Sequence, residues 1–362
     1  MDNVEILAFA TKGTDTNDEA RILRLLEEFN VQVVPFDRGG KLESFLTIIQ
    51  QALRTKPKVI VMEGTGIAGG FACLFLRCFF FINYVFSSGD AIAPFISLNY
   101  PFFIPIVEIY EQLLCRFCAG FIGWTPYLVG RALTFAAPKG ITAAGWANFP
   151  RSPEQLAESR INIRKQLGIP DNSIVFGLVG SLVWTRRFGY CYGYDLVQAF
   201  QRINRDDVSI LIVGDGNGIP HLKQLAANGL DKQIFLPGNV PYEQVLDYLA
   251  AMDVASLPQS VDGVGSFRYT TKISEYVAAK LPVVTSQIPM AYDIGGDWVW
   301  RLPGSKPWED CYIDSLASLM QSITQEDIKY KQQEIPVQLS EFEQEQQVVR
   351  VTNFLKDIIN SI

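Results

Sequence analysis

Short apolar runs rich in β-branched residues alternate with longer helical segments along the whole chain. In the first half, strands are predicted at residues 5–10, 31–36, 58–63, 82–87, 120–124 and 141–146. In the second half, strands are predicted at residues 174–182, 209–213, 234–236, 254–257 and 282–285. Buried strands joined by helices form parallel sheets that are covered by helices on both faces. The pattern therefore predicts an α/β protein with two sheets, of six and five strands.

The length of 362 residues exceeds what one hydrophobic core usually supports, so two domains are expected. Residues 148–155 contain two prolines and no apolar periodicity, and they are predicted to be the linker. The domains are accordingly predicted at residues 1–150 and 151–339. Residues 340–362 carry an apolar stripe opposite Glu, Gln and Lys, which is typical of an amphipathic helix.

Composition excludes several classes of protein. The net charge of −7 argues against a nucleic-acid binder, which needs clustered Lys and Arg to neutralise phosphates. The chain contains a single histidine, His221, so His-based zinc sites and Ser-His-Asp triads are not expected. The six cysteines lie mostly in apolar helical segments and are predicted to be buried free thiols in a reducing compartment.

Two apolar regions raise the question of a membrane. Residues 69–86 have Arg77 at their centre, and they are predicted to form a buried helix (71–80) and an interior strand (81–87). The N-terminus lacks the positive charges of a signal peptide, so a cytoplasmic location is expected. Aromatic and proline residues at 95–127 suggest that this region contacts either an apolar substrate group or, peripherally, the surface of a membrane.

The most informative motif spans residues 261–284. A polar loop with two glycines precedes an amphipathic helix, and a β-branched strand follows Pro282. Glu275 lies within the helix, with Arg268 and Lys272 just before it. Cations beside a helix N-terminus are typical of a site for an anionic ligand.

This motif resembles the nucleotide-sugar signature of family-4 glycosyltransferases, which reads acid-Gly-Phe-Gly and then Glu-x-Met-Ala-x-Gly-x-Pro-Val-Val. Four further blocks of the second half resemble that family in the correct order: residues 174–182, 193–200, 211–216 and 235–240. The resemblance implies the GT-B fold, in which two Rossmann-like domains face a cleft and the last helix crosses back to the first domain. It also implies a nucleotide-diphosphate sugar as the donor, a glycan or lipid-linked acceptor, and no cofactor.

The resemblance also assigns roles to individual residues. Glu275 corresponds to the acid that binds the donor ribose, and Asp262 to the acid that holds the donor sugar. The remaining donor-binding candidates are Arg186, Arg187, Lys272, Arg268, Gly13, Gly214, Gly216 and Val240. Asp90 follows the fourth strand and is predicted to contact an acceptor hydroxyl, with a turn-capping role as the alternative. Glu275 is predicted to line a solvent-filled cleft and to contribute little to folding.

The chain departs from the family pattern at three positions. Tyr192 stands where the family has a lysine, and Phe267 stands at the usual spacing of the first acid. Lys280 replaces the glycine before the Pro-Val-Val strand. These departures leave open a binding or scaffold protein whose donor site has decayed.

The reaction implied by the resemblance is transfer of a sugar from a nucleotide diphosphate to an acceptor. Negative charge builds on the leaving nucleotide, and cations or a helix N-terminus must stabilise it. The metal-binding spacing Asp-x-Asp is absent from the chain, so transfer without metal is expected. The resemblance to family 4 implies that the reaction proceeds with retention at the sugar carbon. A sugar-nucleotide epimerase or phosphorylase on the same fold is the third alternative. A dinucleotide fingerprint is not present, because position 219 after Gly214 and Gly216 is isoleucine.

Overall fold

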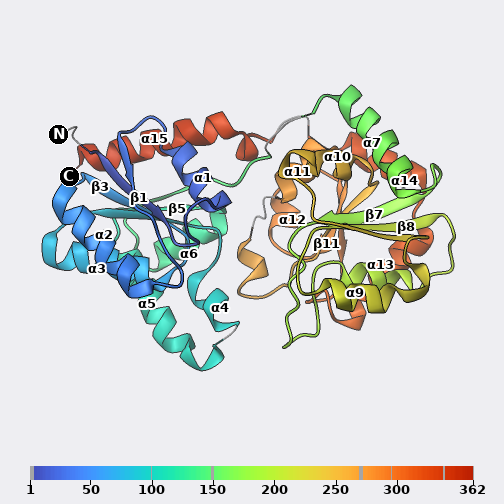
Figure 1. Ribbon diagram of the computed structural model, residues 1–362, viewed down its shortest axis with the longest axis horizontal. Helices are drawn as coiled ribbons and strands as arrows, with labels where there is room; N and C mark the ends of the chain where they lie inside the picture. The colour runs from blue at the N-terminus through green and yellow to red at the C-terminus, as the bar shows by residue number, and fades with distance from the viewer. Residues whose placement is uncertain are drawn as a thin grey trace. The chain divides into compact units, whose positions relative to one another are not determined.

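The computed structural model describes residues 4–98, 100–147, 151–268, 272–294, 296–336 and 339–361 (Figure 1). The chain divides into two compact units. Unit 1 comprises Met1–Gly145, Phe267–Thr270 and Leu339–Ile362, and unit 2 comprises Trp146–Ser266 and Thr271–Gln338. Residues 148–150 of the predicted linker lie outside the described residues.

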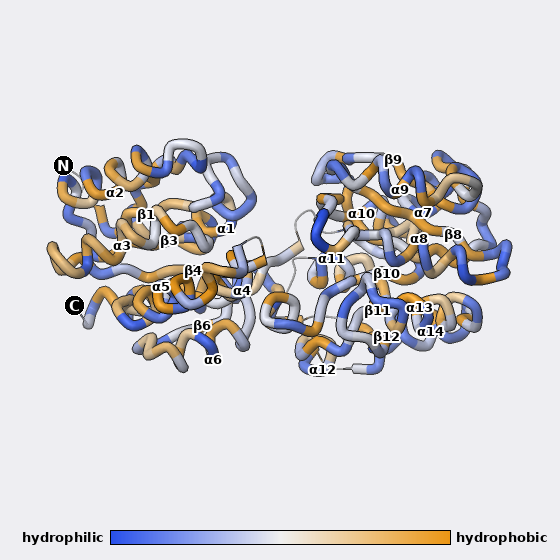
Figure 2. Tube along the Cα trace, turned by 90° about the horizontal axis from the view of Figure 1, so that it is seen from below, coloured by the Kyte–Doolittle hydropathy of each residue, from blue (hydrophilic) through white to orange (hydrophobic). Residues whose placement is uncertain are grey.

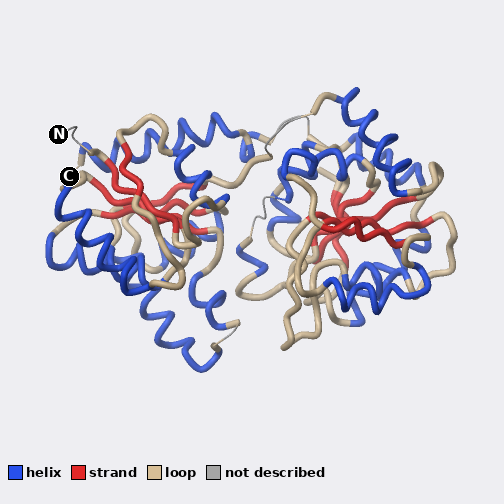
Figure 3. Tube along the Cα trace, viewed as in Figure 1, coloured by secondary structure: helices blue, strands red, loops and turns tan. Residues whose placement is uncertain are grey.

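Unit 1 is built on a six-stranded parallel sheet, flanked by helices on both faces (Figure 3). Its strands are β1 (Ile6–Ala10), β2 (Val31–Val33), β3 (Val59–Glu63), β4 (Tyr84–Ser88), β5 (Gly120–Gly123) and β6 (Gly140–Thr142), in the order β2-β1-β3-β4-β5-β6. The central strands β1, β3 and β4 are buried along their whole length, because helices cover both faces. All six strands predicted for the first half are confirmed, and β2 and β6 are shorter than expected.

The helices of unit 1 are α1 (Asn17–Leu25), α2 (Lys41–Thr55), α3 (Ile67–Phe80), α4 (Ile92–Ser97), α5 (Ile104–Phe117), α6 (Pro126–Thr134) and α15 (Gln344–Asn360). The 3₁₀ turn η1 (Pro101–Phe103) precedes α5. α1 begins at Asn17, since the Thr16 side chain accepts a hydrogen bond from the Glu19 backbone N–H. The C-terminal helix α15 lies in unit 1, where Phe354 and Ile358 cover Gly120 of β5.

Unit 2 is built on a second six-stranded parallel sheet. Its strands are β7 (Ile174–Val179), β8 (Val208–Val213), β9 (Ile234–Gly238), β10 (Val254–Leu257), β11 (Val283–Ser286) and β12 (Val299–Leu302), in the order β12-β11-β10-β7-β8-β9. The prediction of five strands in this half was wrong. The edge strand β12 escaped prediction because Arg301 interrupts its apolar run, and this side chain bonds to the Ala291 carbonyl instead of entering the core.

The helices of unit 2 are α7 (Pro153–Leu167), α8 (Tyr194–Phe200), α9 (Ile219–Ala226), α10 (Val245–Ala250), α11 (Lys272–Ala278), α12 (Met290–Asp293), α13 (Asp310–Ser322) and α14 (Gln325–Gln333). α7 begins inside the stretch predicted to be linker. Ser152 and Gln155 form a capping box, and Pro153 occupies the first helical position. These residues therefore start a helix, although they read as a loop by composition.

Two predictions about burial need correction. The segment 71–80 does form a helix, but it is buried on one side only, because Phe71, Phe79 and Phe80 are exposed on α3. The strand after it begins only at Tyr84. Among the cysteines, Cys78 and Cys311 are exposed, while the other four are buried free thiols. Amphipathic periodicity shows which residues share a face, but it does not show which neighbouring element covers that face.

Candidate functional site

In unit 2 the strand order reverses between β7 and β10. Ligands of open α/β sheets bind beside the carboxyl ends of the strands at such a reversal. Gly180 directly follows β7, and Gln259 lies two residues after β10. The side chains gathered at these two strand ends make up the candidate donor site.

Lys272 lies against the backbone that follows β7. A Cβ atom at Gly180 would be 2.7 Å from Lys272 Cε and 2.9 Å from Nζ, so the end of this lysine side chain lies directly on the Gly180 backbone. Lys272 Nζ lies 4.9 Å from the centroid of the Tyr192 ring, which is a cation–π contact. The Tyr192 hydroxyl accepts a hydrogen bond of 3.1 Å from the buried Gln259 side chain. Tyr192, which replaces the family lysine, thus holds Lys272 beside the end of β7.

Glu275 lies one turn further along α11 and is buried, with 8% of its surface exposed. Burial raises the pKa of Glu275 to about 7, while the charge of Lys272 and a hydrogen bond from Tyr242 act in the opposite direction. The expectation of a solvent-lined carboxylate is therefore wrong. Tyr242 begins the 3₁₀ turn η3 (Tyr242–Gln244), just after the half-buried Val240 in the loop that follows β9. No motif in the sequence marked Tyr242 or Gln259 as a site residue.

The glycines after β8 shape the loops of this site. Gly214 and Gly216 have φ angles of +141° and +154°, which favour glycine. A Cβ atom at Gly214 would be 1.8 Å from the Gly180 carbonyl oxygen, and one at Gly216 would be 2.4 Å from that of Leu182. These two glycines therefore let the loop after β8 pack directly onto the loop after β7.

Arg186 and Arg187 are exposed in a turn of the long loop after β7. Thr185 and Tyr190 close this turn by backbone pairing, and Arg187 lies 5.4 Å from the centroid of the Phe188 ring. The turn is anchored, because the Tyr190 hydroxyl donates a 2.9 Å bond to the buried Asp195. The two arginines thus project from a fixed turn.

Asp262 uses one carboxylate oxygen within its own loop. Its Oδ1 accepts hydrogen bonds from the backbone N–H groups of Val264, at 2.8 Å, and Gly265, at 3.0 Å. This is the bonding of an Asx turn, and it orders the glycine loop ahead of the 3₁₀ turn η4 (Gly265–Phe267). A role in holding the donor sugar stays a prediction.

Arg268 is not grouped with Lys272 and Glu275, although the three are near neighbours in the sequence. Phe267 and Arg268 belong to unit 1, where Arg268 Nε bonds to Asp90 Oδ1 at 2.5 Å. The Asp90 backbone N–H and carbonyl both bond to Ser88 Oγ, so this acid also lies in a fixed turn. Gly13 lies in the loop after β1 with φ +111°, and its carbonyl accepts a bond from Thr16 Oγ1.

A buried ion pair at the carboxyl ends of the unit 1 strands was not anticipated. Arg21 Nη1 donates to Glu63 Oε2 at 2.8 Å, and Trp124 Nε1 donates to Glu63 Oε1 at 3.2 Å. Glu63 is 1% exposed and Arg21 6%, and burial raises the pKa of Glu63. The signal available in the sequence was an acid that directly ends a buried apolar strand. The pair therefore attaches α1 to the carboxyl end of β3.

The described residues contain no cluster of three or more His, Cys, Asp or Glu side chains that could hold a metal ion. None of their helices combines the length and the apolar character that crossing a membrane requires.

Part of unit 2 is similar to a known protein family. Residues 173–300, which contain β7 to β11, match the family described as Glycosyl transferases group 1. TuaC of Bacillus subtilis (strain 168) is 32% identical to this chain over 139 residues. That protein is named as a proposed glycosyltransferase of teichuronic acid biosynthesis. The match covers 38% of this chain and 30% of that relative, so the chain spans less than a third of the curated relative it matches.

Solved structures share the whole fold at low sequence identity. HepE of Anabaena, solved with UDP and glucose, superposes on 99% of this chain and 100% of its own, with a TM-score of 0.62 and 17% identity. Sucrose-phosphate synthase of Thermosynechococcus elongatus does so over 99% and 100%, with a TM-score of 0.68 and 13% identity. The predicted GT-B fold is confirmed. The resemblance to nucleotide-sugar-dependent glycosyltransferases is also confirmed, while family 4 in particular stays a prediction.

Proposed function

We propose that this chain, whose residues 173–300 are a domain of the glycosyl transferases group 1, transfers a sugar from a nucleotide-diphosphate donor to a glycan or lipid-linked acceptor. The observation that carries the proposal is the position of Lys272 against the backbone that follows β7, with the buried Glu275 one turn further along the same helix and inside the matched domain. UDP is the first nucleotide to test, since the HepE structure of the same fold holds UDP and glucose.

Each side chain of the cluster has a chemical task in this proposal. The Lys272 ammonium balances the negative charge that develops on the leaving diphosphate, which lowers the barrier to bond cleavage. The Glu275 carboxylate accepts hydrogen bonds from ribose hydroxyls, and these bonds are strong only when the acid is ionised. Arg186 and Arg187 supply further positive charge from their exposed turn. Transfer proceeds without a metal ion and with retention at the sugar carbon.

The proposal includes the setting of the reaction. The aromatic residues around α5 favour an acceptor with an apolar part, and the protein works in the cytoplasm with peripheral contact to a membrane. Asp90 contacts the acceptor hydroxyl through the carboxylate oxygen that does not bond to Arg268, and Asp262 contacts the donor sugar through the carboxylate oxygen that its Asx turn does not use.

Calorimetric titration with UDP-, GDP- and ADP-sugars in EDTA tests donor binding. One of these donors is expected to bind with micromolar affinity, and its nucleotide is expected to be released when a glycan or lipid-linked acceptor is added. If no nucleotide binds, the chain is a scaffold with a decayed donor site. If binding requires a divalent ion, the metal-free chemistry is wrong.

A second candidate is a sugar-nucleotide epimerase. A protein of Listeria monocytogenes with the same fold, whose name proposes a UDP-N-acetylglucosamine 2-epimerase, superposes over 100% of this chain and 98% of its own, with a TM-score of 0.59 and 12% identity. Product analysis separates the two. A transferase consumes an acceptor and yields a new glycosidic bond, whereas an epimerase yields an isomeric donor or sugar without any acceptor.

A further inference from the structure

Unit 1 exposes many apolar side chains on α2, α3, η1 and α5, which together are called here the aromatic face. Its most exposed members are Phe102 (94%), Phe81 (77%), Leu42 (72%), Phe79 (68%) and Ile106 (64%). α2 packs along α3, and α3 packs along α5, so these side chains belong to neighbouring helices (Figure 1). Figure 2 shows hydrophobic residues along most of α3 and α5.

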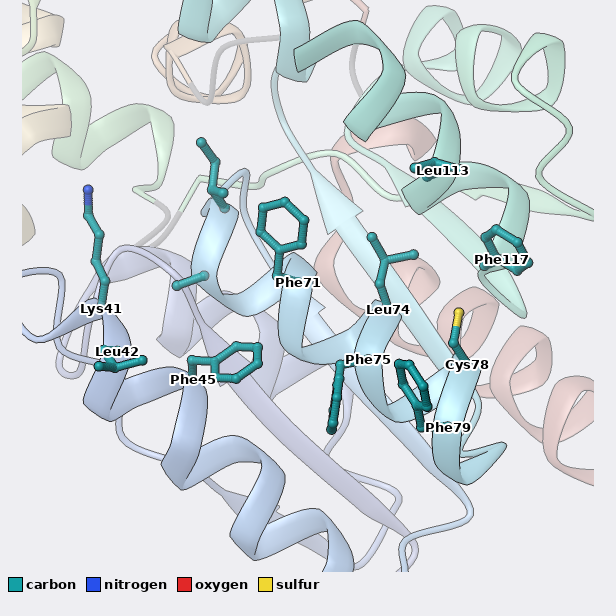
Figure 4. Close-up of a pocket in the computed structure, with 12 residues that line it drawn as sticks. Lys41, Leu42, Phe45, Phe71, Leu74, Phe75, Cys78, Phe79, Leu113 and Phe117 are labelled. Atoms are coloured by element: carbon teal, nitrogen blue, oxygen red, sulfur yellow. The ribbon is translucent and has the colours of Figure 1, made fainter. Parts of the chain in front are cut away.

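A groove of about 770 Å³ runs through the aromatic face (Figure 4). Phenylalanines of α2 and α3 form one part of its wall, and Leu113 and Phe117 of α5 form another. The rings are packed together, with centroid separations of 6.2 Å between Phe45 and Phe75 and 4.9 Å between Phe75 and Phe79. Lys41 is the single charged residue among the twelve described residues that line the groove.

Exposure of this kind carries a free-energy cost in water. A helix as apolar as α3 is normally buried, and each square ångström of apolar surface left in water forgoes roughly 25 cal/mol. Monomeric proteins rarely expose apolar patches of more than a few hundred Å² unless the patch binds a partner. The aromatic face therefore indicates a binding surface.

Charge indicates which partner this surface takes. The helices of the face carry four exposed cationic residues, Lys41, Arg54, Lys56 and Arg116. Glu111 is neutralised by its ion pair with Arg131, which leaves Glu43 and the half-buried Glu108 as the opposing acidic residues of these helices. This local positive charge stands out in a chain of net charge −7. A symmetric dimer through the face would bring these cations toward their own copies, and like charges oppose association. Anionic lipid headgroups neutralise them instead.

We infer that the aromatic face docks on an anionic lipid bilayer, with the exposed phenylalanines inserted at the boundary between headgroups and acyl chains. Aromatic and aliphatic side chains flanked by Lys and Arg are typical of helices that lie in this boundary. The inference specifies the surface for the peripheral contact in the proposed function. It does not depend on the transfer chemistry, because the face belongs to unit 1 and the candidate donor site to unit 2.

Vesicle flotation tests the inference. The wild type is expected to float with vesicles of phosphatidylethanolamine and phosphatidylglycerol at low salt, and much less with pure phosphatidylcholine or at high salt. In the double variant Phe79→Ser/Phe102→Ser, the fraction of protein bound to anionic vesicles is expected to be lower by about fivefold or more. The matched control is Ile161→Ser/Tyr330→Ser, which removes two exposed apolar residues from unit 2, 67% and 53% exposed, and should float like the wild type.

Three results would overturn the inference. The wild type could fail to float with the anionic vesicles, or the two double variants could float equally well. Alternatively, sedimentation velocity could show a wild-type dimer that dissociates in Phe79→Ser/Phe102→Ser, which would assign the face to a second copy. Nucleotide titration of the same variant keeps the two proposals apart, because retained nucleotide affinity with lost flotation separates lipid docking from donor binding.

Discussion

At the scale of single residues, burial changes what Glu275 does. The folded state holds its pKa at about 7, well above the 4.5 of an exposed glutamate, because the side chain is desolvated. Between these two pKa values the folded protein keeps a proton that the unfolded chain has released. The free energy of unfolding must therefore fall as the pH rises through this window.

Glu275→Gln is expected to remove this pH dependence. The wild type should lose thermal stability between about pH 5 and pH 8 relative to the variant, since glutamine does not titrate. Nucleotide affinity should fall about tenfold, because charge-assisted bonds to the ribose become neutral ones. Thermal melts across pH, with titration calorimetry at neutral pH, measure both effects. Parallel stability curves would contradict the buried carboxylate, and unchanged affinity would remove it from the donor site.

Lys272→Met tests the phosphate contact separately. The affinity for a nucleoside diphosphate should fall by about tenfold or more, whereas the affinity for the nucleoside should stay the same. Lys232→Met, at an exposed position of the same unit, serves as the control for loss of one positive charge. An equal loss in both variants, or a loss for the nucleoside as well, would argue against a direct contact with the diphosphate.

At the scale of elements, contacts between loops decide where glycine is required. The loop after β8 lies directly on the loop after β7, and Gly214 has no space for a Cβ atom. Gly189 also has a positive φ, of +60°, but the nearest atom to its Cβ position is 4.0 Å away. Both glycines therefore adopt a backbone conformation with positive φ, but only Gly214 is also packed too closely for a side chain.

Gly214→Ala is expected to destabilise unit 2 by about 3 kcal/mol or more, since steric overlap adds to backbone strain. Gly189→Ala carries only the strain, roughly 1–2 kcal/mol. Chemical denaturation followed by tryptophan fluorescence compares the two variants. If both lose the same free energy of unfolding, the packing of the two loops is not what requires glycine at position 214.

At the scale of the whole molecule, each unit has its own sheet and core, and α15 completes unit 1. Its inner residues cover Gly120, while Arg350 Nη1 bonds to the Thr142 carbonyl at 3.0 Å. The final segment of the chain therefore stabilises the unit that contains the N-terminus.

Phe354→Ala should destabilise unit 1 by about 3–5 kcal/mol, because it opens a cavity over β5. Val349 lies on the same helix and is 59% exposed, so Val349→Ala should change the free energy of unfolding by less than about 0.5 kcal/mol. Limited proteolysis with peptide mapping shows which unit opens. Early cleavage within unit 2 in Phe354→Ala would contradict the placement of α15.

The class of fold, and the resemblance of part of unit 2 to group 1 glycosyl transferases, could be predicted from the sequence alone. Apolar runs alternating with helices marked eleven of the twelve described strands, since strands covered on both faces must be continuously apolar. The motifs from Ile174 to Val284 marked the domain because their glycines and charged residues follow strand ends in a fixed order. Local patterns suffice where neighbouring residues along the chain make the contacts.

Tertiary structure decided which of these residues meet. Arg268 and Lys272 are four positions apart, yet Arg268 pairs with Asp90 in unit 1 and Lys272 lies beside Gly180 in unit 2. The burial of Glu275, the contact of Tyr192 with Lys272 and the exposure of the phenylalanines on α3 all depend on residues distant in sequence. Periodicity records which side of an element is apolar, but only the packing of elements determines what that side contacts and how much water it keeps.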